Sequence, residues 1–248
     1  MSDERTEQAP DDDLGQLLAA AEAEKDGGDM AAAAESFAAA LAVIDDARGS
    51  GDNASEQRDY VVQQLALTTY KSGEPTEREA LERGLEIIAQ LHPETSDDTE
   101  TLGIAGAMEK RLWTLLGDRT HLDRTIERYE RGFQIGRDYY NGENYATALV
   151  QRAAVQDNDD DALADRTTAR TVREQIVEGL DRDLAADDAD QRDDLAWMHA
   201  TMANCLFALG RQDAALEHER AFKALAGDVG WMLETYEDGK ARVLAEQT

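Results

Sequence analysis

The feature that most constrains this chain is a recurring pair of helix-forming segments with small residues at fixed offsets. Between residues 14 and 45, the Gly27-Gly28 turn separates two such segments, and the second carries Ala33, Phe37 and Ala40. Spacings of four and three residues put these side chains on one helical face, where small residues let two helices approach closely. One helix pair cannot bury its apolar face alone, so pairs must stack on one another. The sequence therefore predicts an all-α fold.

The same offsets recur later, at Thr125, Tyr129 and Gly132, and again from Ala215, although Glu219 and Phe222 depart from the pattern. The expected helix pairs span residues 14–45, 57–92, 98–136, 143–187 and 196–226, and residues 229–246 are expected to form a capping helix. Only three prolines interrupt the chain, and no strand-like alternation is present.

A two-helix period of about 34 residues resembles the tetratricopeptide repeat. We expect a single tetratricopeptide-like domain over residues 14–248, with antiparallel helix pairs forming a solenoid, after a disordered acidic tail at residues 1–13. A generic helical bundle is the alternative. A solenoid presents a concave inner surface for binding.

The charge balance excludes several classes of partner. The chain has 54 Asp and Glu against 25 Lys and Arg, a formal net charge of −29. Nucleic acids and anionic membranes bind basic surfaces, so neither is an expected partner. Only five of the basic residues are lysines, and the carboxylates are spread along the chain. This composition predicts a halophilic host, where molar salt screens self-repulsion; an acidic mesophilic protein is the alternative.

The sequence also contains no run of about 18 apolar residues that could span a membrane. Its first residues lack the basic start and apolar stretch of a signal peptide, so we expect a cytoplasmic protein. Cys205 is the only cysteine, which excludes an intrachain disulfide and a zinc site built from cysteines. We expect Cys205 to be a small buried residue.

The centre of the chain carries a more specific resemblance, in the segments Glu100–Arg111, Ile126–Phe133 and Asp138–Leu149. These segments resemble the TRAFs-binding, tetratricopeptide-type region of the mitogen-activated protein kinase kinase kinases. They also resemble its prokaryotic relatives, the tetratricopeptide-repeat sensor domains. The residues that match the family pattern are Lys110, Tyr140, Gly142, Asn144 and Ala146, whereas Ala107, Glu109 and Glu143 depart from it.

This resemblance implies a sensor or scaffold. In the kinases the region is regulatory and contacts partner proteins, and in prokaryotes it is proposed to sense a signal and control an associated effector. We therefore expect a non-catalytic adaptor or regulatory sensor that binds a partner protein or peptide. The alternative is a small-molecule sensor for a nucleotide-like ligand.

The residues expected to bind the partner or ligand lie in this central region: Lys110, Arg111, Tyr140, Asn144 and Thr147. A helix start near Asn144, together with Tyr140 and the two basic residues, would form a polar pocket for a phosphate or carboxylate. The other interpretation is structural, because an Asn at a helix N-terminus caps free backbone N–H groups.

Other candidate sites fail on spacing. The acidic segment Asp157–Asp161 has Ala162 and Thr168 where a calcium-binding EF-hand needs Gly and Glu, so we expect a solvated loop. The four histidines show no metal-ligand spacing, and no nucleophile or phosphate-loop motif is present. We expect no catalytic residue, no metal and no cofactor. The tryptophans, Trp113, Trp197 and Trp231, are expected to pack in the core or between repeats.

Overall fold

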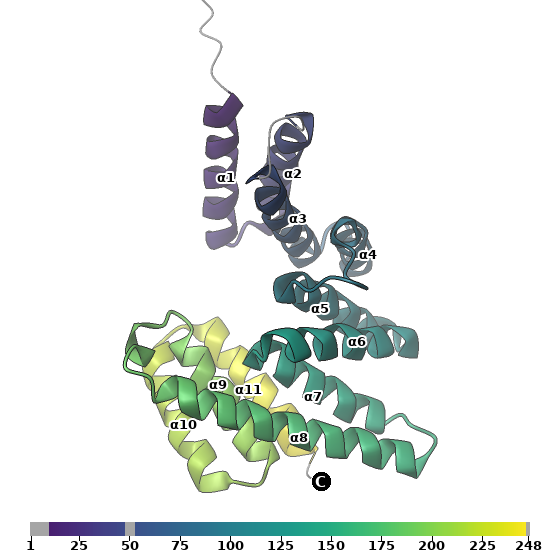
Figure 1. The fold of residues 1–248 in the computed structure, drawn as a ribbon, viewed down its shortest axis with the longest axis vertical. Coiled ribbons are helices and arrows are strands. Elements are labelled where there is room, and N and C mark those ends of the chain that lie inside the picture. The colour runs from purple at the N-terminus through teal and green to yellow at the C-terminus, as the bar shows by residue number, and fades with distance from the viewer. Residues whose placement is uncertain (1–9, 48–52, 247–248) are drawn as a thin grey trace, which may run out of the picture. The chain divides into compact units, whose positions relative to one another are not determined.

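The computed structural model describes residues 10–47 and 53–246, which form eleven α-helices, two short 3₁₀ helices and no strand (Figure 1). The helices stack as neighbouring pairs, which confirms the predicted all-α repeat solenoid. They group into two compact units, residues 1–121 and 122–248. Among the described residues, no helix is long and apolar enough to cross a membrane.

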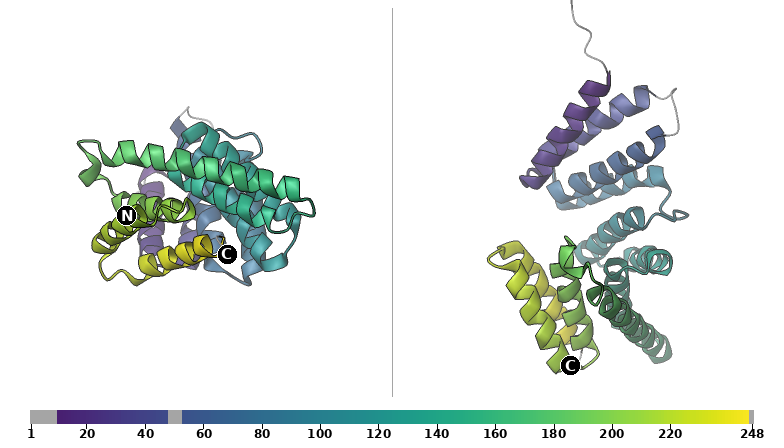
Figure 2. Two further views of the ribbon diagram at one scale, coloured as in Figure 1. Left: turned by 90° about the horizontal axis from the view of Figure 1, so that it is seen from below. Right: turned by 60° about the vertical axis from the view of Figure 1, so that its left-hand side comes forward.

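The first unit contains five helices and one 3₁₀ turn: α1 (Pro10–Asp26), α2 (Met30–Asp46), α3 (Asn53–Ser72), α4 (Glu77–Ile88), η1 (Ala89–Leu91) and α5 (Thr99–Leu116). Each helix packs against the next, and α3 also contacts α5, the first helix of the following pair. Figure 2 shows α1 to α4, from purple to blue, as successive layers in a second view.

Helix α6 (Arg119–Gly136) begins at the boundary between the two units and lies mostly in the second. The rest of the second unit consists of α7 (Tyr139–Ala153), α8 (Asp159–Leu184), η2 (Ala189–Gln191), α9 (Leu195–Ala208), α10 (Gln212–Ala226) and α11 (Gly230–Ala245). Helix α8 packs on α7 and α9, and α10 pairs with α9. Helix α11 lies mainly against α9, the position expected of a capping helix.

The small-large-small pattern has the packing role that the sequence predicts. Ala33, Phe37 and Ala40 are fully buried and share a core with Val61 of α3. Gly132 is at the last position of the pattern on α6, and a Cβ there would lie 2.7 Å from the side chain of Asn141 on α7. Only a residue without a side chain permits this approach of α6 to α7.

Local sequence explains where helices begin and end. The Thr76 hydroxyl caps α4 by accepting a hydrogen bond from the Glu79 N–H, and it donates one to the Glu79 carboxylate. Gly117 ends α5 in the left-handed conformation, with φ of 67°. These short-range devices set the helix boundaries, and the buried faces then determine how the helices pack.

Two expected boundaries differ from the structure. Helix α1 already begins at Pro10, so residues 10–13 of the expected tail are helical, and residues 1–9 lie outside the described part of the chain. The expected acidic loop Asp157–Asp161 was wrong from Asp159 onward, because Asn158 caps α8 and three aspartates occupy its first turn. Carboxylates are favourable there because a helix N-terminus is electropositive.

Candidate functional site

The candidate site lies in the second unit, where α6 ends and α7 begins. Arg137 follows the last residue of α6 with φ of 52°, and its N–H donates to the Phe133 carbonyl at 2.9 Å. Asp138 then caps α7 by accepting a hydrogen bond from the Asn141 N–H at 2.8 Å. A left-handed backbone is unfavourable for a residue with a side chain, so Arg137 is a strained residue at a sharp turn.

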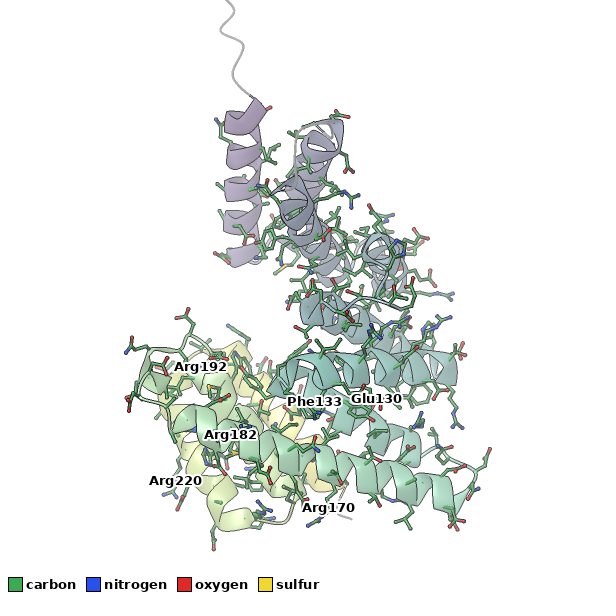
Figure 3. The ribbon with its side chains drawn as sticks, in the orientation of Figure 1. Glu130, Phe133, Arg170, Arg182, Arg192 and Arg220 are labelled. Atoms are coloured by element: carbon green, nitrogen blue, oxygen red, sulfur yellow. The ribbon has the colours of Figure 1, made fainter. Side chains whose placement is uncertain are left out.

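A pocket of about 350 Å³ opens beside this turn. It is formed by the end of α6, the start of α7, the C-terminal part of α8 and the segment before α9. Its lining residues are Gly136, Arg137, Asp138, Tyr139, Tyr140, Ile176, Gly179, Leu180, Asp183, Arg192 and Asp194. Buried Ile176 and Leu180 supply apolar surface, and the absence of a side chain at Gly179 leaves space between them. Figure 3 labels Phe133 on α6 and Arg192 on the segment that precedes α9.

One wall of the pocket is a hydrogen-bonded chain. The Tyr139 hydroxyl donates to Asp194 at 3.0 Å, and the Arg192 guanidinium donates two hydrogen bonds of 2.9 Å to the same carboxylate. Arg192 holds the pKa of Asp194 below its ordinary value, while burial and the bond to Asp194 raise the pKa of Tyr139. Asp194 therefore stays ionised and Tyr139 stays neutral at neutral pH.

Two side chains at the pocket mouth reach solvent. Tyr140 is 50% exposed, and its ring meets the buried Tyr129 ring edge-on, with centroids 6.1 Å apart. The Arg137 guanidinium carbon lies 5.5 Å from the centre of the Phe133 ring, and one of its nitrogens donates to Gln175 at 3.3 Å. The mouth thus offers an aromatic face and a cation to a ligand.

The structure places the sequence-predicted residues in different parts of the chain. Tyr140 lines the pocket, whereas Asn144 and Thr147 lie half-buried further along α7 and do not line it. The predicted helix start near Asn144 was wrong, because α7 begins at Tyr139 and Asn144 donates to the Tyr140 carbonyl at 2.9 Å. Lys110 and Arg111 are on α5, in the first unit.

Sequence reasoning missed most of the pocket. Arg137, Tyr139, Arg192 and Asp194 were not singled out, although Tyr139 lies in the central region. Arg192 and Asp194 come from a segment more than fifty residues away in sequence, and no local pattern connects them to α7. The signal that marks this turn is the left-handed backbone of Arg137, which the sequence does not reveal.

The remaining candidates do not line this pocket. Cys205 is buried, as predicted, and its burial raises the pKa of its thiol. Within the described ranges, no group of three or more His, Cys, Asp or Glu could hold a metal ion. Trp231 differs from the expectation of a packed residue, because it is 63% exposed even though its ring lies 5.8 Å from that of Trp197.

Comparisons with known proteins agree with the helix-pair architecture. Residues 29–149 match the family model described as Tetratricopeptide Repeats-Sensor, just under half of the chain. This segment includes all five residues that the sequence predicted as binding residues. The resemblance to sensor domains is therefore confirmed, whereas the resemblance to the TRAFs-binding region stays a prediction.

Among solved structures, the chain is similar to the crystal structure of a thermophilic tetratricopeptide-repeat protein of Thermus thermophilus. The TM-score is 0.58 and the identity 16%, over 91% of this chain and 98% of that one. At this identity the likeness shows the fold alone. No curated protein matches the chain.

Proposed function

We propose that this tetratricopeptide-repeat protein of the sensor type is a non-catalytic adaptor or regulatory sensor that binds a partner protein or peptide. The observation that carries the proposal is the pocket beside the N-terminus of α7, with apolar surface inside and Tyr140 and Arg137 at its mouth. Its volume of about 350 Å³ lies near the small end of the range for ligand sites, so it suits one or two side chains of a bound segment.

The ionisable groups of the pocket favour binding over catalysis. General acid–base catalysis works best with groups whose pKa lies near the operating pH. Here the pKa of Tyr139 is raised and that of Asp194 is lowered, so both shifts move away from neutrality. The neutral Tyr139 hydroxyl and the Asp194 carboxylate hold the pocket wall in place, and their oxygens can accept hydrogen bonds from a peptide.

A nucleotide-like ligand is the second possibility raised by the resemblance to sensor domains. Its support is that resemblance alone, so the experiment below includes nucleotides as a competing outcome. Control of an associated effector requires more than binding: the ligand must have different affinities for two conformations of the protein.

The experiment selects peptides from a displayed random library on the full chain and measures their affinity by fluorescence anisotropy. We expect Tyr140→Ala to weaken the selected peptide at least tenfold, since exposed aromatic anchors contribute most to such contacts. Leu163→Ala is the matched control, because Leu163 is 60% exposed on α8 and lies outside the pocket. Circular dichroism verifies that both variants fold.

Equal losses in the Tyr140 and Leu163 variants would show that the pocket is not the binding site. A parallel thermal-shift series with ATP, ADP and NAD tests the other ligand class. Stabilisation by a nucleotide that disappears in Tyr140→Ala, with no peptide selected, would replace the peptide-binding proposal by the nucleotide one.

A further inference from the structure

The capping helix α11 presents a large apolar side chain to solvent. Trp231, in its first turn, is 63% exposed, more than any other large apolar side chain of the described residues. Exposed Leu225 and Val229 precede it in a compact turn, where the Val229 N–H donates to the Ala226 carbonyl at 3.2 Å. The last helix of a repeat array normally covers the core with a polar outer face. This end of the fold therefore has an apolar patch that capping does not require.

A row of aromatic rings supports the Trp231 side chain. Its ring centre lies 5.8 Å from that of half-buried Trp197 on α9, and the Trp197 ring lies 6.0 Å from that of Phe222 on α10. Phe222 is fully buried, and its ring lies 4.7 Å from that of buried Tyr236 on α11. Because Trp231 already packs against this row, little conformational entropy is lost when a partner covers its exposed face.

Packing within the chain explains only one side of the Trp231 ring. The contact with Trp197 shields part of that half-buried ring, which is a structural role for Trp231. The same contact leaves most of Trp231 in water. Rigid aromatic side chains that are exposed in the free protein and buried in a complex contribute most to protein–protein contacts.

The charges beside this ring have one sign. Residues 228–238 include four acidic residues and no Lys or Arg. Three of the four, Asp228, Glu234 and Asp238, are exposed and form no ion pair in the described part of the chain. Glu234 and Asp238 follow Trp231 by three and seven residues, so they lie on the same face of α11 as the ring.

This combination of an apolar ring and unpaired carboxylates selects the kind of partner. A second copy of the chain in a twofold contact would bring the same carboxylates against one another. Nucleic acids and anionic membrane surfaces are repelled by these carboxylates as well. A segment that carries both apolar residues and several Lys or Arg complements the ring and the charges together.

We propose that Trp231 and the carboxylates beside it form a docking surface for a basic amphipathic helix of a partner protein. Such a helix has an apolar stripe flanked by Lys and Arg, so one segment can cover the ring and pair with Glu234 and Asp238. The surface shares no lining residue with the pocket beside α7. A failure of the pocket variants would therefore leave this proposal standing, and the reverse also holds.

The test uses the full chain and a fluorescein-labelled peptide of Leu and Lys, with Leu at helical spacings of three and four residues. One counterpart has Glu in place of Lys, and another has Gln in place of Leu. We expect the Leu–Lys peptide to bind at least tenfold more tightly than either counterpart in fluorescence anisotropy. Trp231→Ala should weaken it by about tenfold or more. Leu163→Ala is the matched control, because Leu163 is similarly exposed but lies on α8, and circular dichroism verifies that both variants fold.

The contribution of the carboxylates is tested by Glu234→Gln combined with Asp238→Asn. We expect a loss of about threefold to tenfold in affinity at physiological salt and a smaller loss in molar KCl, where the charges are screened. The control is Glu77→Gln with Glu86→Gln, which changes the net charge equally at two exposed positions on α4. Equal losses in the two double variants would show that overall charge, and not this surface, attracts the peptide.

Fluorine NMR locates the contact without an altered side-chain size. The chain labelled with 5-fluorotryptophan has three signals, one for each tryptophan. We expect the Trp231 signal to shift when the Leu–Lys peptide is added, while the Trp113 signal stays in place. Tyr140→Ala separates the two proposals, because it should weaken the peptide selected on the pocket and leave the Trp231 shift as in the parent protein.

The proposal is overturned if the Trp231 signal does not move at up to millimolar peptide, or if Trp231→Ala binds the Leu–Lys peptide as well as the parent does. It is overturned too if the Leu–Glu peptide binds as tightly as the Leu–Lys peptide. Sedimentation of the chain alone tests the remaining occupant. A dimer that Trp231→Ala dissociates would assign this surface to a second copy and end the proposal.

Discussion

Replacing Gly142 by Ala tests how closely α6, α7 and α8 approach one another. Gly142 is buried in the first turns of α7, and a Cβ at this position would lie 2.8 Å from two ring atoms of Phe133 and 2.9 Å from the Ile176 side chain. Both neighbours are themselves buried, with exposures of 4% and 3%. The added methyl group therefore cannot be accommodated unless one of the packed helices moves.

The expected magnitude follows from two opposing effects. Overpacking a core in this way costs about 1–3 kcal/mol. Ala is better than Gly inside a helix by up to about 1 kcal/mol, which offsets part of that cost. We therefore expect Gly142→Ala to lower the free energy of unfolding by up to about 2 kcal/mol.

Gly179→Ala is the matched control on α8. A Cβ at Gly179 would meet only an Arg182 nitrogen at 4.0 Å, so the helix-propensity gain should appear alone and stabilise the protein by about 0.5–1 kcal/mol. Urea unfolding followed by tryptophan fluorescence measures both variants, in a Trp113→Phe background so that only Trp197 and Trp231 of the second unit report. A Gly142→Ala protein as stable as the Gly179→Ala protein would refute the close packing of these three helices.

Four further predictions concern strain, acid, a buried ion pair and salt. Arg137→Gly should raise the free energy of unfolding by about 1 kcal/mol in urea, because Gly accepts the left-handed backbone. The same variant should lower the affinity for the selected peptide in fluorescence anisotropy, and a variant that is not more stable, or that binds as well as the parent, would contradict this prediction. The Nδ1 atoms of His199 and His218 lie 2.9 Å apart, and burial lowers the pKa of both side chains. Because the unfolded chain then binds protons more tightly than the folded one, the free energy of unfolding should fall as the pH drops below about 6.5. An unfolding midpoint that is flat from pH 7.5 to 5 would show that the pair does not titrate in this way. Glu246→Ala leaves the buried Arg173 guanidinium without the carboxylate that accepts its bonds of 2.7 and 3.1 Å, and should cost about 3 kcal/mol in urea unfolding; a loss well under 1 kcal/mol would contradict this role. The net charge of −29 predicts more helix by circular dichroism in molar KCl than in dilute buffer, and equal spectra would count against the halophilic assignment.

The helices and their pairing were predictable because their causes are local. Ala33, Phe37 and Ala40 are spaced so that only one helical face can bury all three, and the structure buries that face completely. The expected pair at 98–136 corresponds closely to α5 and α6, since Gly117 ends one helix just before the other begins. The buried face of a helix and the residue at which it ends can therefore be predicted from hydrophobic periodicity and turn residues within the segment itself.

The pocket was largely unpredictable because it depends on contacts between distant segments. Tyr139 and Asp194 are 55 residues apart in sequence and meet only because α8 packs on both α7 and α9. The sequence predicts the start of α7 too late, near Asn144, whereas Asp138 caps the helix in the structure. The same local error affected the acidic segment, where Asn158 starts a helix before the aspartates.

Hydrogen–deuterium exchange with and without the selected peptide is the most direct test of the claim that this chain acts by binding at the pocket beside α7. The proposal predicts slower amide exchange in the segments around Gly136–Tyr140 and Ile176–Asp183, without a matching change at the exposed Trp231. Protection near Trp231 with none around Gly136–Tyr140 would contradict it.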